Sequence, residues 1–154
     1  MITYQPKKKE VKREWFLFDV EGKILGRVAS EIATKLMGKD KVNYSQHMDS
    51  GNYVVVINAK GIKVTGKKEI QKVYRGHSGY PGGFKEIKYS KVMNENPTKI
   101  IHLAVKGMLP DNRLKDKRMA RLKIFPGKLH PYSDKFQKTE KSENQGKESE
   151  KEQK

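Results

Sequence analysis

Hydrophobic residues in the first half of the chain form short continuous runs separated by a stretch with helical spacing. The apolar run over residues 15–18 predicts a strand buried on both faces. Apolar residues at helical spacing from Leu25 to Leu36, followed by Gly38, predict a helix. A second apolar run over residues 53–57 predicts another buried strand. Strand, helix and strand in this order indicate a parallel βαβ unit.

The pattern between residues 39 and 95 is weaker. Residues 39–52 are predicted to form a loop, residues 62–74 a weak extended stretch, and residues 75–83 a glycine-rich loop. A short strand is expected over residues 84–89 and a helical turn over residues 90–95.

A stronger helical signal begins at Asn96 and Pro97, because asparagine caps helices and proline suits the first helical position. Pro110 ends this helix. Its apolar stripe comprises Ile100, Leu103, Ala104, Gly107 and Met108, and its polar face comprises Lys99, His102 and Lys106. Residues 111–122 keep a helical but mostly charged pattern, and residues 122–125 predict a last short strand.

Composition narrows the class of protein. The chain has 154 residues, no cysteine and a net charge of +16. This length suits one domain. No apolar run is long enough for a membrane span, and no secretory signal is recognisable. The lack of cysteine excludes disulfides, thiolate zinc sites and cysteine nucleophiles.

The charge is unevenly distributed along the chain. Residues 137–154 hold five Lys and five Glu and no apolar residue, which predicts a disordered neutral tail. The excess charge therefore lies in a basic N-terminal arm, residues 1–13, and a single domain, residues 14–136. Nucleic acid is the favoured partner, because cations on phosphates gain from counterion release. An anionic membrane is the second candidate partner, but binding to it would need a basic amphipathic helix with an aromatic face.

A near match to a phosphate-binding loop occurs in the middle of the chain. Gly61, Gly66 and Lys67 fit the loop pattern, but Lys68 stands where a Ser or Thr should hold magnesium. The residues that follow are not expected to open a helix. We therefore favour a strand and a basic turn over a nucleotide site.

The histidines and carboxylates give little support for catalysis or metal binding. The four histidines, at positions 47, 77, 102 and 130, share no close metal-ligand spacing. The carboxylates form no obvious acid–base pair, and no nucleophile elbow is present.

The glycine-rich segment over residues 75–83 is the most unusual one. Arg75 can bind phosphate, and His77 and Ser78 can donate hydrogen bonds. Tyr80 can stack on a base or ribose, or it can pack as a lid on the core. Four glycines in nine residues allow another backbone to approach closely. We favour RNA contact for this segment.

A basic ridge is predicted near the end of the domain. Arg113, Lys117 and Arg121 recur at intervals of four, and only Asp111 and Asp116 oppose the ridge charges within the segment. Phosphate contact is favoured over a solvated face. The complete predicted RNA-binding set is Lys39, Lys41, Lys67, Lys68, Arg75, His77, Ser78, Tyr80, Lys106, Arg113, Lys115, Lys117, Arg118, Arg121 and Lys123.

Several long motifs occur together in this chain. They are W-F-L-F-D at 15–19, E-G-K at 21–23, L-G-R-V-A-S at 25–30, N-A at 58–59, V-T-G-K-K at 64–68, H-S-G-Y-P-G-G at 77–83, V-K-G-M-L-P at 105–110, N-R-L at 112–114, Gly127 and H-P at 130–131. In this order and nearly without gaps, they resemble large ribosomal subunit protein thirteen, bacterial type.

The resemblance implies a three-layer α/β/α domain around a mostly parallel sheet. It implies a structural protein of the cytoplasmic ribosome, which binds large-subunit ribosomal RNA, lies beside other large-subunit proteins and supports subunit assembly. It implies no enzymatic activity, no cofactor, no small-molecule substrate and no membrane partner. The chain departs from the family in its tail after about Phe136 and in Tyr132, where the family often has His.

Two alternatives remain open from the residues. One is a free RNA- or DNA-binding regulator or nucleic-acid chaperone. The other is a nucleotide-dependent phosphotransferase that uses Lys67.

Overall fold

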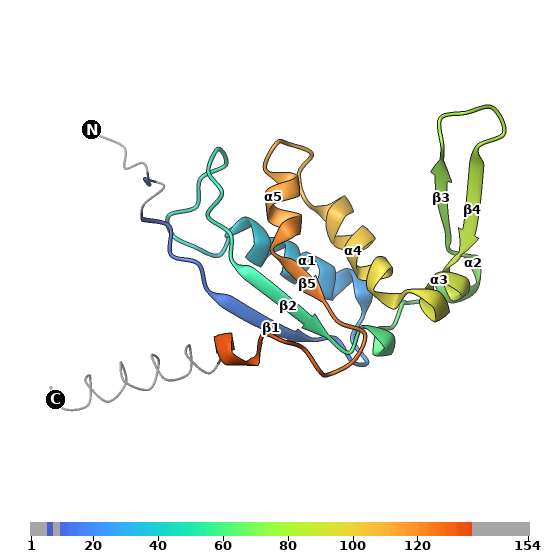
Figure 1. The fold of residues 1–154 in the computed structure, drawn as a ribbon, viewed down its shortest axis with the longest axis horizontal. Coiled ribbons are helices and arrows are strands. Elements are labelled where there is room, and N and C mark those ends of the chain that lie inside the picture. The colour runs from blue at the N-terminus through green and yellow to red at the C-terminus, as the bar shows by residue number, and fades with distance from the viewer. Residues whose placement is uncertain (1–5, 8–9, 137–154) are drawn as a thin grey trace, which may run out of the picture.

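A three-stranded parallel sheet forms the centre of the molecule (Figure 1). The computed structural model describes residues 6–7 and 10–136. The sheet order is β1 (Trp15–Asp19), β2 (Tyr53–Ile57) and β5 (Leu122–Ile124), with β2 parallel to both neighbours. Helix α1 (Leu25–Met37) connects β1 to β2, which confirms the predicted βαβ unit.

The remaining elements lie between β2 and β5 in the chain. They are η2 (Ala59–Gly61), α2 (Lys68–Gln71), β3 (Val73–His77), β4 (Phe84–Lys88), α3 (Tyr89–Glu95), α4 (Pro97–Met108) and α5 (Lys115–Ala120). Strands β3 and β4 pair antiparallel in a hairpin that stands apart from the central sheet (Figure 1). The α/β class, with helices flanking a mostly parallel sheet, is confirmed. None of the helices within the described residues has the length and apolar character needed to cross a membrane.

The two faces of the central sheet are covered in different ways. Val54 and Val56 are fully buried in the same core cluster as the apolar residues of α1 and α4. On the other face, Trp15 stacks on Tyr53 with ring centroids 4.4 Å apart. Tyr132 stacks on the same indole at 5.3 Å. The segment after β5 therefore returns to cover part of the second face.

Burial on both faces is confirmed for β2 and is wrong for β1. Residues 54–57 of β2 are all buried, whereas Leu17 of β1 is 46% exposed. Strand β1 lies at the edge of the sheet, and β2 is its one partner among the described strands. A run of apolar residues has the same appearance in a central strand and in an edge strand, so the pattern alone could not separate them.

The region over residues 62–83 differs from its prediction. The extended stretch is reduced to a single bridge between Lys63 and Ile24, followed by α2 and then β3. Helix α2 begins directly after Lys67, where no helix was expected. Strand β3 runs into the predicted glycine-rich loop, because residues 73–77 pair with β4. Only residues 78–83 remain as the hairpin tip.

The start of α4 is confirmed, but two details of the helix are wrong. The Asn96 side chain does not cap a backbone N–H, because its Oδ1 accepts the Thr98 hydroxyl at 2.6 Å. The spacing also predicts that Gly107 and Met108 belong to the apolar stripe, but both residues are exposed. The fully buried positions of the helix are Ile100, Ile101 and Val105. Packing against both α1 and η2 widens the buried face beyond one narrow stripe.

Candidate nucleic-acid interface

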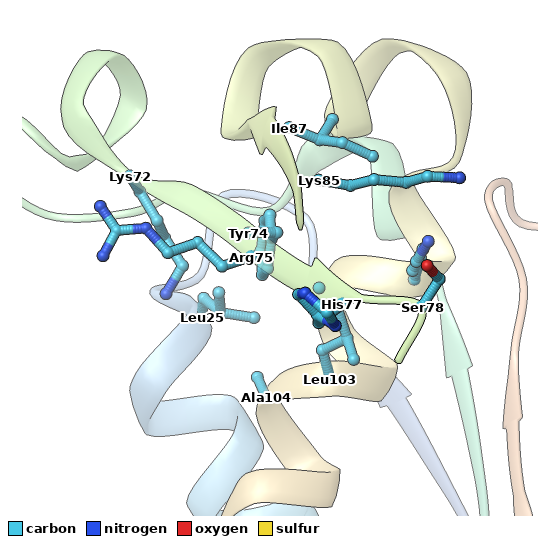
Figure 2. A pocket seen from close by; sticks show the side chains of 12 residues that line it. Leu25, Lys72, Tyr74, Arg75, His77, Ser78, Lys85, Ile87, Leu103 and Ala104 are labelled. Atoms are coloured by element: carbon cyan, nitrogen blue, oxygen red, sulfur yellow. The ribbon is translucent and has the colours of Figure 1, made fainter. Parts of the chain in front are cut away.

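A cleft lies between the β3–β4 hairpin and the helices of the body (Figure 2). Its volume is about 640 Å³. The hairpin and the residue before it supply Lys72, Tyr74, Arg75, Gly76, His77, Ser78, Lys85 and Ile87, and the body supplies Leu25, Lys99, Leu103 and Ala104. The cleft therefore brings the predicted Arg75, His77 and Ser78 together with side chains of α1 and α4.

The walls of the cleft are positively charged. Lys72, Arg75, Lys85 and Lys99 line it, and no carboxylate among residues 6–7 and 10–136 does. The Arg75 Nε lies 3.1 Å from Glu86 Oε1, but both side chains are largely exposed. An exposed ion pair of this kind contributes at most about 1 kcal/mol, so the guanidinium can exchange this partner for a phosphate.

The floor of the cleft is apolar. Leu103 and Ala104 of α4 lie opposite the hairpin, and Tyr74 lines the cleft from β3 (Figure 2). Partial burial raises the pKa of Tyr74 above its usual value. The Lys72 Nζ lies 5.4 Å from the centre of the Tyr74 ring, within the range of a cation–π contact.

The hairpin tip orients His77. Its Nδ1 accepts a hydrogen bond from the Gly79 N–H at 2.9 Å. A neutral imidazole donates from the nitrogen that does not accept, so Nε2–H is available to a ligand. Gly79 has φ of +87°, a backbone conformation that glycine adopts without strain. Tyr80 is 75% exposed, so the interpretation of this ring as a lid on the core is wrong.

The other predicted residues are spread over the surface. Those that are exposed are Lys39, Lys67, Lys68, Lys106, Arg113 and Lys117, whereas Lys115 and Lys123 are half-buried. Lys41 donates to the Lys12 carbonyl at 2.6 Å, and partial burial lowers the pKa of its ammonium. None of these residues lines the cleft.

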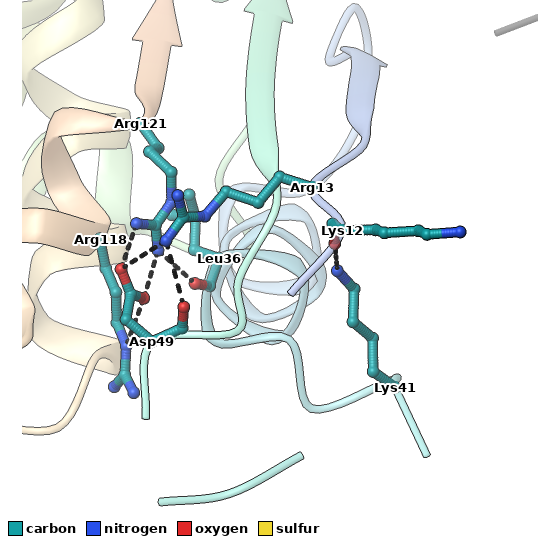
Figure 3. Close-up of polar contacts among 7 residues, drawn as sticks. All are labelled: Lys12, Arg13, Leu36, Lys41, Asp49, Arg118 and Arg121. Carbon is teal, nitrogen blue, oxygen red and sulfur yellow. Dashed lines mark hydrogen bonds and ion pairs between the residues drawn. The ribbon is translucent and has the colours of Figure 1, made fainter. Parts of the chain in front are cut away.

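The basic ridge is not formed as predicted. Arg118 and Arg121 point inward, with only 1% and 8% of their side chains exposed. Both guanidinium groups lie near the carboxylate of Asp49, which also meets Arg13 (Figure 3). Helix α5 begins at Lys115, so Arg113 lies outside it. Asp49, which is 72 residues from Arg121 in sequence, thus neutralises positive charge that the few carboxylates nearby in the sequence do not offset.

Sequence reasoning missed four residues that matter here. Lys72, Lys85 and Lys99 line the cleft, and Asp49 pairs with the arginines. Lys85 lies in the strand predicted over residues 84–89, but its pairing with Gly76 is visible only in the folded hairpin. No local signal identified Asp49, because its partners are distant in sequence. Within the described part of the chain, no group of three or more potential metal-ligating side chains comes together.

Comparison with known proteins places the chain in a family. The model of the ribosomal protein L13 family matches residues 13–131. The chain belongs to this family. The L13 match confirms the resemblance carried by the sequence motifs, and it spans the parallel sheet, the hairpin and the cleft. L13 is a family of ribosomal structural proteins and not a class of enzymes.

Its L13 relatives are similar over most of their length. The large ribosomal subunit protein uL13 of Syntrophus aciditrophicus (strain SB) is 52% identical over 130 residues, which cover 84% of this chain and 92% of the relative. The protein of the same name from Thermosipho africanus (strain TCF52B) is 55% identical over 127 residues, covering 82% and 85%. That of Thermoanaerobacter sp. (strain X514) is 50% identical over 141 residues, covering 92% and 97%.

Proposed function

We propose that this L13 protein is a structural constituent of the large ribosomal subunit, binds large-subunit ribosomal RNA and supports assembly of the subunit. In the cytoplasmic ribosome it would lie beside other large-subunit proteins. The names of its relatives support the place in the subunit. The observation that carries RNA binding is the cleft, whose lining, as far as the structure describes the chain, includes four cationic side chains and no carboxylate.

The chemistry of the cleft suits a folded RNA segment. Lysines that neutralise phosphates release counterions, which favours binding without reading the sequence. Within the cleft, the Nε2–H of His77 can donate to a ribose or phosphate. Tyr80 does not line the cleft, but it is exposed at the hairpin tip and can stack on a base there. Twenty-eight of the 34 basic residues are lysine, so diffuse phosphate contact dominates over fork-like recognition of bases.

Sedimentation tests the place in the ribosome. The full-length chain is expected to travel with large subunits through a gradient after a high-salt wash, because many distributed contacts hold a structural protein to RNA. If the chain stays at the top of the gradient while the subunits remain intact, the proposal fails. That result would instead favour the free nucleic-acid-binding regulator or chaperone.

Charge removal in the cleft tests where RNA binds. The triple variant Lys72→Gln, Lys85→Gln, Lys99→Gln is expected to reduce the slope of log affinity against log salt by about 2 to 3, because each lost phosphate contact removes about 0.7–0.9. The matched control replaces three exposed lysines outside the cleft, Lys60, Lys91 and Lys128, by Gln. Filter binding of a large-subunit RNA fragment over a salt series measures both. If the salt slope falls equally in the two variants, the cleft is not the region that contacts RNA.

A further inference from the structure

Arg118 carries a buried charge. Its side chain is 1% exposed, and its Nε, Nη1 and Nη2 atoms make no hydrogen bond to any residue that the structure describes. Its one ion-pair contact within the described residues is a 3.8 Å separation between Nε and Asp49 Oδ1. Burying a guanidinium without hydrogen bonds is costly, so this arrangement calls for a further partner.

Asp49 does not supply that partner, because Arg121 binds both of its oxygens and Arg118 makes no hydrogen bond to it. Arg121 donates to both carboxylate oxygens of Asp49, and Arg13 Nη2 lies 3.7 Å from Oδ2 (Figure 3). Three guanidinium groups therefore share a single carboxylate. The cluster keeps an excess of positive charge, and Arg118 holds the weakest contact in it.

A pocket beside Arg118 offers room for an anion. It has a volume of about 660 Å³, with Arg118 in its lining. The other polar side chains that line it are Lys39, Tyr44, Gln46 and Asn112. Each of these side chains carries an N–H or O–H donor, and no carboxylate from the described part of the chain lines the pocket. Gly107 is also in the lining, and a methyl group added there would meet no described atom within 4 Å apart from its own chain neighbours and helix backbone, so this wall is open.

We propose that this pocket is a phosphate subsite in which Arg118 is the principal ligand. A phosphate would satisfy the guanidinium with paired N–H donors and offset the excess charge of the cluster. In the free protein the three guanidinium nitrogens are closed off from solvent, so the phosphate must displace part of the pocket wall. Lys39, Tyr44 and Gln46 lie in chain without helix or strand, which is the part of the wall that can yield.

The natural source of the phosphate rests on the proposed function. If the chain binds ribosomal RNA, a backbone phosphate is the expected occupant. Inorganic phosphate has the same chemistry and can bind without any RNA. The subsite and the ribosomal role can therefore fail separately, because an assay with inorganic phosphate involves no nucleic acid.

Thermal unfolding of the full chain tests the subsite. Sodium phosphate is expected to raise the melting temperature by about 3 °C over sodium chloride of equal ionic strength, since a ligand that binds only the folded state stabilises it. Arg118→Met should lose this increment. The matched control Arg27→Met removes an exposed arginine of α1 and should keep it.

A second variant covers the case in which Arg118→Met does not fold. Asn112 is exposed, and its Oδ1 accepts from the Leu114 N–H at 3.1 Å. Asn112→Asp keeps this acceptor and adds a negative charge to the pocket wall, so the phosphate increment should fall. The proposal is overturned if wild type gains nothing over chloride, or if the increment survives in Asn112→Asp and in any Arg118→Met protein that folds.

Binding of a large-subunit RNA fragment then separates the two sources of phosphate. A salt slope reduced by about 1 in Asn112→Asp or Arg118→Met indicates a backbone phosphate in the subsite. An unchanged slope together with a lost phosphate increment indicates free phosphate. A chain that does not sediment with ribosomes but shows the Arg118-dependent increment keeps the subsite and loses the ribosomal role.

Discussion

Replacement of Asp49 by alanine is expected to lower the free energy of unfolding by about 3–5 kcal/mol, because removal of one partner leaves buried charge uncompensated. Asp49 is the carboxylate that contacts Arg13, Arg118 and Arg121 among the described ion pairs. Of these arginines, Arg118 and Arg121 are almost fully buried. Urea denaturation measures the change.

The control for this substitution is Asp116→Ala, which removes the same charge from an exposed position on α5. Its cost should stay within about 1 kcal/mol, the range for a carboxylate in the first turn of a helix. In addition, Asp49→Ala combined with Arg121→Met should lose less than the sum of the single changes, since the orphaned guanidinium is removed as well. A loss for Asp49→Ala no larger than for Asp116→Ala would mean that the arginines do not depend on this carboxylate.

Substitution of Gly51 by alanine is expected to lower the free energy of unfolding by about 3 kcal/mol, the upper end of the usual cost of overpacking. The added Cβ would lie 1.7 Å from the Leu36 carbonyl oxygen and 2.9 Å from Arg121 Nη2. The backbone at Gly51 cannot easily move away from α1, because the adjacent Asn52 N–H donates to the Lys35 carbonyl at 3.0 Å. The segment before β2 is thus held against the C-terminal end of α1.

Gly107→Ala is the matched control for this effect. Gly107 lies in α4, and an added Cβ there meets no described atom within 4 Å apart from its chain neighbours and the backbone of its own helix. Alanine is the better helix former by about 1 kcal/mol, so the control should leave stability unchanged or raise it slightly. Thermal and urea unfolding of both variants measure the difference. Equal destabilisation by the two substitutions would contradict the close approach at Gly51.

Hydrophobic periodicity predicted the elements whose own residues carry a clear apolar pattern. The helical spacing from Leu25 to Leu36 and the apolar run of β2 each match an element of the structure. Gly38 ends α1 with φ of +75°, the conformation that its position after the helix indicated. These predictions succeeded because the signal and the element occupy the same residues.

The hairpin and the candidate site were only partly predictable. The segment containing Arg75, His77 and Ser78 drew attention by composition, and these residues do line the cleft. Lys72 and Lys99 line the same cleft, but this follows only from the position of the hairpin against α4 in the tertiary structure. Arg118 and Arg121 of the predicted ridge are buried. Helical spacing shows on which face of a helix a residue lies, but it does not show which other element packs against that face.

The sequence by itself determined the α/β class, the βαβ order and the L13 motifs, because each is written in consecutive or regularly spaced residues. The tertiary structure alone decided which basic residues face solvent. Asp49 and Arg121 are 72 residues apart, and their pairing exists only after the loop before β2 packs against α1. Charge neutralisation acts through space, so a count of charges along the chain cannot show where the excess lies.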